Sequence, residues 1–301
     1  MDDKIPYEKP FLDYQAQIEL LKERGLAFES EDKALHLLEK ISYYRLSGYW
    51  YSLLDDKQNH QFKEGASFNI AFQLYCFDKD LRKIFIAEIE KIEIAIRARI
   101  IHVMSESFGP FWIEKPELFP KKAGYEEIKK TVTKEYGRCE ETFIDAFRLK
   151  YSNELPPCWM LMEVTSFGTL SLVYKHLKHG KSKRAIAEHF GLDDNTFESW
   201  LHSIVYVRNI CAHHSRLWNR VLKVRPKIAT TDNEWLQNPD VSNSRIFYFA
   251  SVLIYMLNVI NPNHRFKEKF LELLKAHQNL DYNRMGFPDG WKDEPLWISR
   301  K

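Results

Sequence analysis

Residues 71–104 read AFQLYCFDKDLRKIFIAEIEKIEIAIRARIIHVM, and this stretch decides the fold. No glycine or proline interrupts the chain from Phe72 to Phe108. The segment can therefore form one continuous helix, on the order of 50 Å long at about 1.5 Å per residue. Apolar side chains recur along it at helical spacing: Leu81, Ile84, Phe85, Ile89, Ile92, Ile96 and Ile100. A helix with so wide an apolar stripe is expected to lie across the core as its spine.

Helical patterns also dominate on both sides of this stretch and predict an all-α fold. Residues 14–24 end at Gly25, which is typical of a helix C-terminus. Ser30 is a suitable N-cap for the next amphipathic segment. Residues 246–260 predict a buried helix and residues 266–277 an amphipathic one. We expect an N-terminal helical region over 1–70, a helical core over 71–260 with an insertion near 110–150, and a C-terminal helix and tail over 261–301, all in one compact unit.

Composition excludes several classes of protein. With 44 basic and 42 acidic residues the net charge is 44 − 42 = +2, so any case for nucleic-acid binding has to rest on local charge. The four cysteines are scattered without a CxxC pair, which favours a reducing, cytoplasmic setting and argues against a structural zinc site. The most apolar run, 246–260, is about five residues too short for the roughly 20 that cross a bilayer. No secretory signal, membrane segment, metal or cofactor is expected.

Residues 207–220, VRNICAHHSRLWNR, place an arginine, an asparagine and two histidines among small apolar residues. The segment belongs to a predicted helix over 196–221, or to the second half of that helix and the turn beyond it. Asn209 and His213 are i and i+4 neighbours on one helical face, and the long side chain of Arg208 can reach the same spot. An arginine and a histidine on a helix also occur in ordinary caps and salt bridges. Zinc bound through Cys211, His213 and His214 is disfavoured, because a second pair of ligands is missing.

The charge around this motif is strongly one-sided. No Asp or Glu occurs between Leu201 and Thr231, whereas six basic residues do: Arg208, Arg216, Arg220, Lys223, Arg225 and Lys227. This predicts a local anion site in a nearly neutral protein. A second basic stretch, 175–184, contains Lys181, Lys183 and Arg184 and reads first as a solvated loop broken by Gly180. If the protein works with a noncoding RNA, as the resemblance described below implies, both stretches are candidates for phosphate contacts with it.

The motif suits cleavage of RNA without a metal. A histidine exchanges protons near neutral pH, and an arginine holds a phosphate with its planar fork. RNA supplies its own nucleophile, the 2′-hydroxyl, so a base, an acid and a cation suffice. Arg208 and His213 are accordingly the predicted catalytic residues, with Asn209 and His214 in support.

Four further positions, three glutamates and one arginine, have two interpretations each. Glu90, Glu93 and Arg97 recur along one side of the long helix, either as a plain i, i+4 ion pair or as a polar row that faces a site. Glu163 interrupts an apolar run, CWMLMEVTSF, where we expect it to need a partner, either a structural one or the Arg/His site.

The aromatic residues near Gly48 also have two interpretations. Tyr43, Tyr44, Tyr49, Trp50 and Tyr51 predict packing, with stacking on RNA bases as the alternative.

RNICAHHSRLWNR resembles the signature of the Abi-type abortive-infection proteins, which belong to the HEPN superfamily of helical nucleases. The similarity includes further blocks in order: ISYYRLSGYW, FDKDLRKIFIAEIEKIEIAIRARI, PPCWMLMEVTSFGTLS, and the MGFP and PLW elements near the end. The resemblance implies a HEPN-like helical bundle with a long central helix and flanking N- and C-terminal helices. It also implies that Arg208 and His213 stand at the family's Arg-x4-His positions and that Glu93, Arg97 and Glu163 line the same cleft.

The resemblance further implies a homodimer, since HEPN sites combine two copies of the motif and this chain has one. Two functions remain open. The first is a toxin-like antiphage endoribonuclease. The second is an RNA-binding module, associated with a noncoding RNA, in a defence or toxin–antitoxin system without cleavage of its own. A protein antitoxin is a possible partner in either case.

Overall fold

The computed structural model describes residues 6–229, 235–277 and 280–298, and helices dominate these residues, which confirms the all-α prediction. The chain divides by its packing into two units, residues 1–80 and 81–301. The boundary falls inside the longest helix, α4 (Phe68–Phe108). This helix covers the predicted segment and begins four residues earlier than Phe72. The hydroxyl of Ser67 accepts a hydrogen bond from the Ile70 backbone N–H at 3.2 Å, as an N-cap residue does.

The first unit contains α1 (Tyr14–Glu23), α2 (Glu31–Ile41), α3 (Tyr43–Trp50), a 3₁₀ turn η1 (Tyr51–Leu53) and the first turns of α4. The N-caps are Asp13, which accepts from Ala16 N–H, and Ser30, which accepts from Lys33 N–H. A two-stranded antiparallel hairpin, β1 (Leu54–Asp56) and β2 (Gln61–Phe62), was not expected from the sequence. It is too short for an alternating pattern to reveal it.

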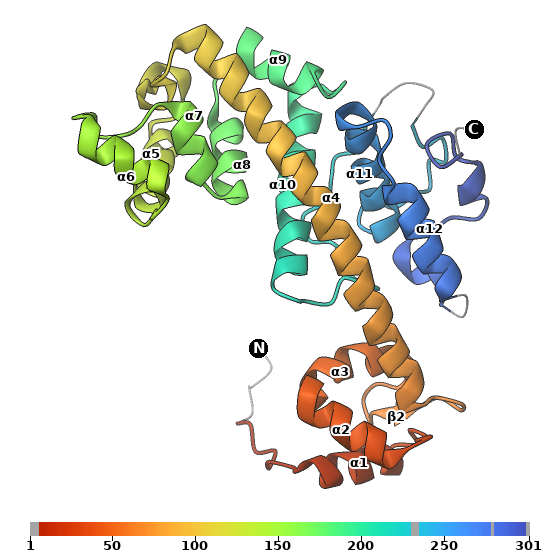
Figure 1. The fold of residues 1–301 in the computed structure, drawn as a ribbon. Coiled ribbons are helices and arrows are strands. Elements are labelled where there is room, and N and C mark those ends of the chain that lie inside the picture. Colours follow the sequence, from red (N-terminus) through yellow and green to blue (C-terminus); the bar gives the residue numbers. More distant parts are fainter. Residues whose placement is uncertain (1–5, 230–234, 278–279, 299–301) are drawn as a thin grey trace. The chain divides into compact units, whose positions relative to one another are not determined.

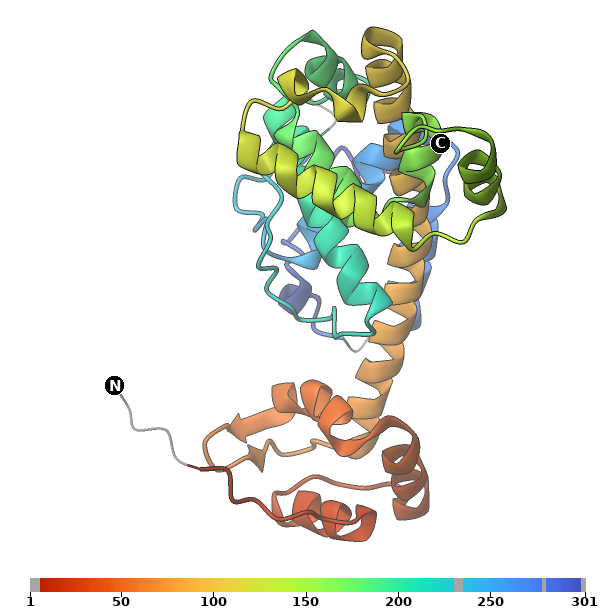
Figure 2. The same ribbon diagram turned by 90° about the vertical axis from the view of Figure 1, so that its left-hand side faces the viewer.

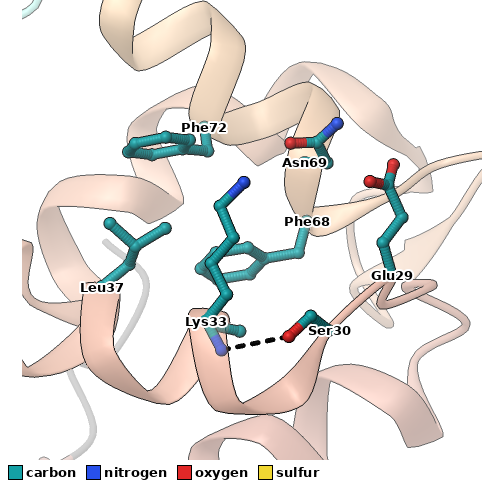
Figure 3. Close-up of a pocket in the computed structure, with 8 residues that line it drawn as sticks. Glu29, Ser30, Lys33, Leu37, Phe68, Asn69 and Phe72 are labelled. Atoms are coloured by element: carbon teal, nitrogen blue, oxygen red, sulfur yellow. Dashed lines mark hydrogen bonds between the residues drawn. The ribbon is translucent and has the colours of Figure 1, made fainter.

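Helix α2 packs against the start of α4 around a small pocket of ≈ 20 Å³ (Figure 3). The Lys33 ammonium lies 5.8 Å from the centre of the Phe72 ring, and Phe28 stacks on Phe68 with ring centres 5.4 Å apart. A space of this size holds about one water molecule. The pocket is therefore a packing defect of the unit and not a ligand site.

In the second unit the apolar stripe of α4 is buried, as its spacing predicts. Phe85, Ile92 and Ile96 are completely inaccessible to solvent. Helices α11 (Ile246–Ile260) and α12 (Phe266–Ala276) lie beside α4 (Figure 1) and cover the stripe at Phe85, which packs on Phe249 at 6.0 Å and on Phe270 at 5.8 Å between ring centres.

The end of the chain completes the same core. After the 3₁₀ turns η5 (Tyr282–Met285) and η6 (Trp291–Asp293), aromatic side chains pack among those of α11 and α12. Trp297 stacks on Phe247 at 5.1 Å, and its indole N–H donates to the Ser251 hydroxyl at 2.8 Å. We call these rings the C-terminal aromatic cluster: Phe247, Phe270, Phe287, Trp291 and Trp297. The tail is thus part of the core rather than a surface appendage.

The remaining elements form a second group of helices in this unit (Figure 2). They are η2 (Trp112–Glu114), η3 (Pro116–Leu118), α5 (Lys122–Gly137), α6 (Thr142–Lys150), α7 (Cys158–Leu161), η4 (Met162–Val164), α8 (Phe167–His176), α9 (Lys181–Glu188) and α10 (Asp194–Ala212). Helix α8 packs on both α5 and α10, and α9 packs on α10. No helix within the described ranges has the length and apolar character needed to cross a bilayer.

Candidate nucleic-acid interface at the end of α10

Helix α10 carries the Arg/His motif in its last turn and is fixed at both ends. At its start the Asp193 carboxylate accepts hydrogen bonds from the backbone N–H groups of Asn195 and Thr196 at 3.0 and 2.9 Å. Along its length the predicted apolar face is buried: Trp200, Leu201, Ile204, Val207 and Cys211. This packing determines which side of the last turn remains open to solvent.

The helix ends at the motif itself. Ser215 N–H donates to the Ile210 carbonyl at 3.0 Å and His214 N–H to the Cys211 carbonyl at 3.1 Å, which is the pair of bonds of a Schellman C-cap. His213 is the C-cap residue, and His214 takes the left-handed conformation (φ 54°) that glycine usually occupies. The predicted segment 196–221 is thus a helix only as far as Ala212, followed by a turn.

The predicted catalytic residues are accessible at this helix end. Asn209 and His213 are exposed and Arg208 is half-buried. Arg208 Nη1 lies 3.4 Å from the Asn209 side-chain oxygen, so these two polar groups meet as the spacing predicts. His213 is tied to Asn209 through its backbone N–H, which donates to the Asn209 carbonyl at 3.0 Å. The guanidinium and the imidazole therefore come from one turn of structure, and both are open to solvent.

The chain beyond the motif is held by apolar anchors and displays cations. Leu217, Trp218 and Leu222 are buried, whereas Lys223 and Arg225 are exposed. Arg216 and Arg220, two of the predicted RNA contacts, are half-buried. The Arg220 guanidinium donates a hydrogen bond to the Arg216 carbonyl at 2.6 Å. Lys227 lies 3.9 Å from the Asp193 carboxylate at the start of α10. The fold thus brings the acid-free stretch to the Asp193 carboxylate at Lys227, and the stretch exposes the side chains of Lys223 and Arg225.

The residues of the second basic stretch, 175–184, differ in their exposure to solvent. Lys181 and Arg184 are exposed on α9, as binding to phosphate requires. Lys183 is 1% exposed, and the expectation that it contacts RNA is wrong. Its ammonium pairs with Glu198 at 2.9 Å, donates to the Lys175 carbonyl at 3.2 Å and lies 5.0 Å from the Tyr174 ring centre. A buried ammonium needs such partners, so Lys183 joins α9 to α8 and α10.

The pair on the long helix has a structural role. The Arg97 guanidinium is buried and pairs with Glu93 at 2.7 Å, four residues earlier. Arg97 also donates to the carbonyls of Met162 and Thr165, which joins α4 to η4. Glu90 is exposed. The interpretation as an i, i+4 ion pair is confirmed, and a further role of Glu93 and Arg97 in a cleft stays a prediction.

Glu163 lies on the surface of η4 and is exposed. The expectation that it needs a partner inside an apolar run is wrong, because the 3₁₀ turn places this one side chain in water. The three residues considered for zinc differ in burial. Cys211 is buried while His213 and His214 are exposed, and among the described residues no three His, Cys, Asp or Glu side chains form a metal-binding group.

A family model described as Abi-like protein matches residues 36–219, which is more than half of the 301-residue chain. The match runs from α2 through the whole of α10 and ends just beyond the motif. No curated protein and no solved structure matches the chain. The length of the family match shows that the chain belongs to the Abi-like protein family.

Proposed function

We propose that the protein is a metal-independent endoribonuclease of the HEPN type that acts in abortive infection against phage. One observation carries this proposal: Arg208 and His213 are both accessible at the end of α10, directly before a chain segment that exposes Lys223 and Arg225. Cations beside a proton-transfer group are what a phosphodiester substrate requires. Membership of the Abi-like family supports the role in abortive infection.

The proposed reaction is an internal transfer within RNA. A histidine acting as base removes the 2′-hydroxyl proton, and the 2′-oxygen forms a bond to the adjacent phosphorus. The bond from phosphorus to the 5′-oxygen breaks, and that oxygen takes a proton from an acid. The products are a 2′,3′-cyclic phosphate and a 5′-hydroxyl, and Arg208 stabilises the extra negative charge of the pentacoordinate state. DNA lacks the nucleophile and is not cleaved.

Two proton transfers are needed, and His213 supplies one of them. In the proposed homodimer, His213 of a second copy supplies the other across the twofold axis. His214 is the adjacent imidazole, and its left-handed backbone turns the chain immediately after His213. Light scattering is expected to show a dimer. A protein that is entirely monomeric while fully active would remove the shared site from the proposal.

Cleavage is tested with purified protein and single-stranded RNA in the presence of EDTA, followed by mapping of the RNA ends. The wild type is expected to leave cyclic-phosphate ends. His213→Ala should lower the rate by about 10²–10⁴-fold, the usual contribution of a general acid or base. Arg208→Ala should lower it by about 10²–10³-fold, the usual effect of losing one group that stabilises transition-state charge. His102→Ala, which removes an exposed histidine on α4, is the matched control and should cleave normally. Cleavage by His213→Ala at the wild-type rate would refute the mechanism.

A second function is supported by a separate observation. Lys181, Arg184, Lys223 and Arg225 are exposed cations, and they are available to RNA whether or not the Arg/His motif is catalytically active. In this case the protein binds a noncoding RNA and does not cleave it. Lys223→Ala and Arg225→Ala should each weaken binding uniformly across RNA sequences and reduce the salt slope by about 1. Wild-type protein that binds with this salt dependence, yet leaves no cut ends under any condition, would favour the binding module over the nuclease.

A further inference from the structure

The first unit has an open cleft of ≈ 810 Å³ that the Arg/His motif does not use. It is lined by the segment before α1, by α1, α2, α3 and η1, and by the hairpin. This volume lies within the range of about 300–1,000 Å³ that is usual for ligand sites. Tyrosine and phenylalanine rings make up much of the lining: Tyr7, Phe11, Tyr14, Tyr43, Tyr44 and Tyr51.

The cleft has a fixed floor and an open rim. Trp50 at the floor is buried, packs against Tyr43 at 4.9 Å between ring centres, and contacts Phe68 of α4 at 6.2 Å. At the rim, Phe11 is 90% exposed and Tyr44 is 89% exposed. Rings this exposed add little to folding, because they are hardly removed from water. They are available to stack on something else.

Positive charge accompanies these rings. Arg24 lies in the lining and donates from Nη1 to the Tyr43 hydroxyl at 3.3 Å. Lys9 and His60 also line the cleft, and the Lys57 ammonium lies 5.6 Å from the centre of the Tyr51 ring. Glu39 is the carboxylate in the lining. Among the described residues, the lining carries two fixed cations, Lys9 and Arg24, against one fixed anion, which favours an anionic ligand with flat, stackable groups.

The backbone of the cleft is held in an unusual conformation. Four non-glycine residues of the described chain have positive φ, namely Ser42, His60, His214 and Asn219. Ser42 (φ 71°) and His60 (φ 56°) both line the cleft, and the other two follow His213 in the chain, one and six residues later. Such residues are costly and concentrate at functional sites. Their positions single out the same two places that the side chains do.

We propose that this cleft binds unpaired nucleotides of single-stranded RNA, with bases stacked on Tyr44 and Phe11 and phosphates held by Arg24 and Lys9. Aromatic rings interleaved with cations are the usual platform for single strands, because every base has a face that can stack. A proline-rich peptide would also find rings here, but it would not use the surplus positive charge. The inference rests on the proposed function only in choosing RNA as the strand. It adds a second RNA-binding site, separate in the chain from Arg208 and His213.

The test measures binding of a fluorescent twelve-nucleotide oligouridylate to full-length protein in the His213→Ala background, where no cleavage is expected. Loss of one stacking ring by Tyr44→Ala or Phe11→Ala should weaken binding by about fivefold to a hundredfold. Tyr44→Trp should retain binding, since it keeps a ring. Tyr151→Ala is the matched control, because it removes a half-exposed tyrosine that is not in the lining.

The affinity for duplex RNA of the same length should not change in Tyr44→Ala, because the bases of a duplex are already stacked on one another. Equal affinity of Tyr44→Ala, Phe11→Ala and the parent for the single strand would overturn the proposal, and so would capture of a proline-rich peptide but not RNA. The two proposals fail independently. Wild-type protein that never cleaves refutes the nuclease, while ring-dependent binding in the same samples would still support this cleft.

Discussion

Replacing Arg97 with methionine is expected to destabilise the second unit by about 3–5 kcal/mol, because it breaks a buried ion pair from one side. Arg97 is 7% exposed and serves three acceptors: the Glu93 carboxylate and the carbonyls of Met162 and Thr165. Hydrogen bonds to a charged group contribute about 1.5–3 kcal/mol each. Methionine fills the space but takes one donor away from each of the three acceptors, of which the Met162 carbonyl keeps the Thr165 hydroxyl as a donor at 2.9 Å. The Glu93 side chain is 17% exposed, so water relieves part of the cost, which favours the lower half of the range.

The assay is urea unfolding followed by tryptophan fluorescence. Every tryptophan except Trp50 lies in the second unit, so the signal reports mainly on that unit. Glu93→Gln combined with Arg97→Met removes the stranded charge and should recover about 1 kcal/mol of the loss. The control is Arg284→Met, which breaks a partly exposed pair with Asp281 (N···O 3.0 Å) and should cost less than about 1 kcal/mol.

The opposite pattern would refute this reasoning. If Arg97→Met unfolds within about 1 kcal/mol of wild type, the three contacts do not hold η4 to α4. If the same variant has also lost RNA cleavage, Arg97 lines the catalytic cleft of Arg208 and His213, as the resemblance implies. A stable but inactive variant and an unstable but active one therefore separate the two interpretations of the Glu93 and Arg97 pair.

Two further predictions concern histidines. His214→Gly should stabilise the protein by about 1 kcal/mol in thermal unfolding, since the left-handed conformation (φ 54°) costs a non-glycine residue about 1–2 kcal/mol and the freer unfolded chain of glycine offsets part of this gain; no gain would mean that the His214 side chain compensates. Burial lowers the pKa of His264 below its ordinary 6.5, and its Nδ1 accepts from Phe266 N–H at 3.2 Å. The unfolded chain therefore binds more protons below pH 6.5, and stability should be lost as pH falls through the folded pKa. His264→Asn should reduce the drop in Tm between about pH 7.5 and 5.5, whereas an unchanged drop would contradict this assignment.

Much of the fold follows from local patterns in the sequence. The length of α4, its buried stripe and the glycine at the end of α1 all follow from spacing and from breaker residues. Lys183 was missed, although a signal was present. Lys183, Ile186 and Ala187 lie at i, i+3 and i+4 and share the buried face of α9. The basic residues around Lys183 obscured this periodicity, because a run of charged residues usually lies on a solvent-exposed face.

The sequence predicted which residues form the candidate site, but it did not predict the backbone conformation that follows them. The motif indicated which polar groups stand together on α10. It contained no glycine or proline to show that the helix stops at Ala212. The end of the helix depends on tertiary packing, because Leu217 and Trp218 are buried shortly after it and the chain has to turn to bury them. Glu163 could not be placed either, because the 3₁₀ turn that exposes it depends on the packing of its neighbours.

The C-terminal aromatic cluster limits how this protein can be dissected. The family match ends at residue 219, but the rings that cover Phe85 of α4 come from residues 249–270, and Trp297 is stacked beside them. A fragment trimmed to the matched region would leave that phenylalanine and its neighbours bare to water and prone to aggregate. Experiments on the Arg/His motif therefore require the chain through Trp297, and affinity tags are better joined at the other end.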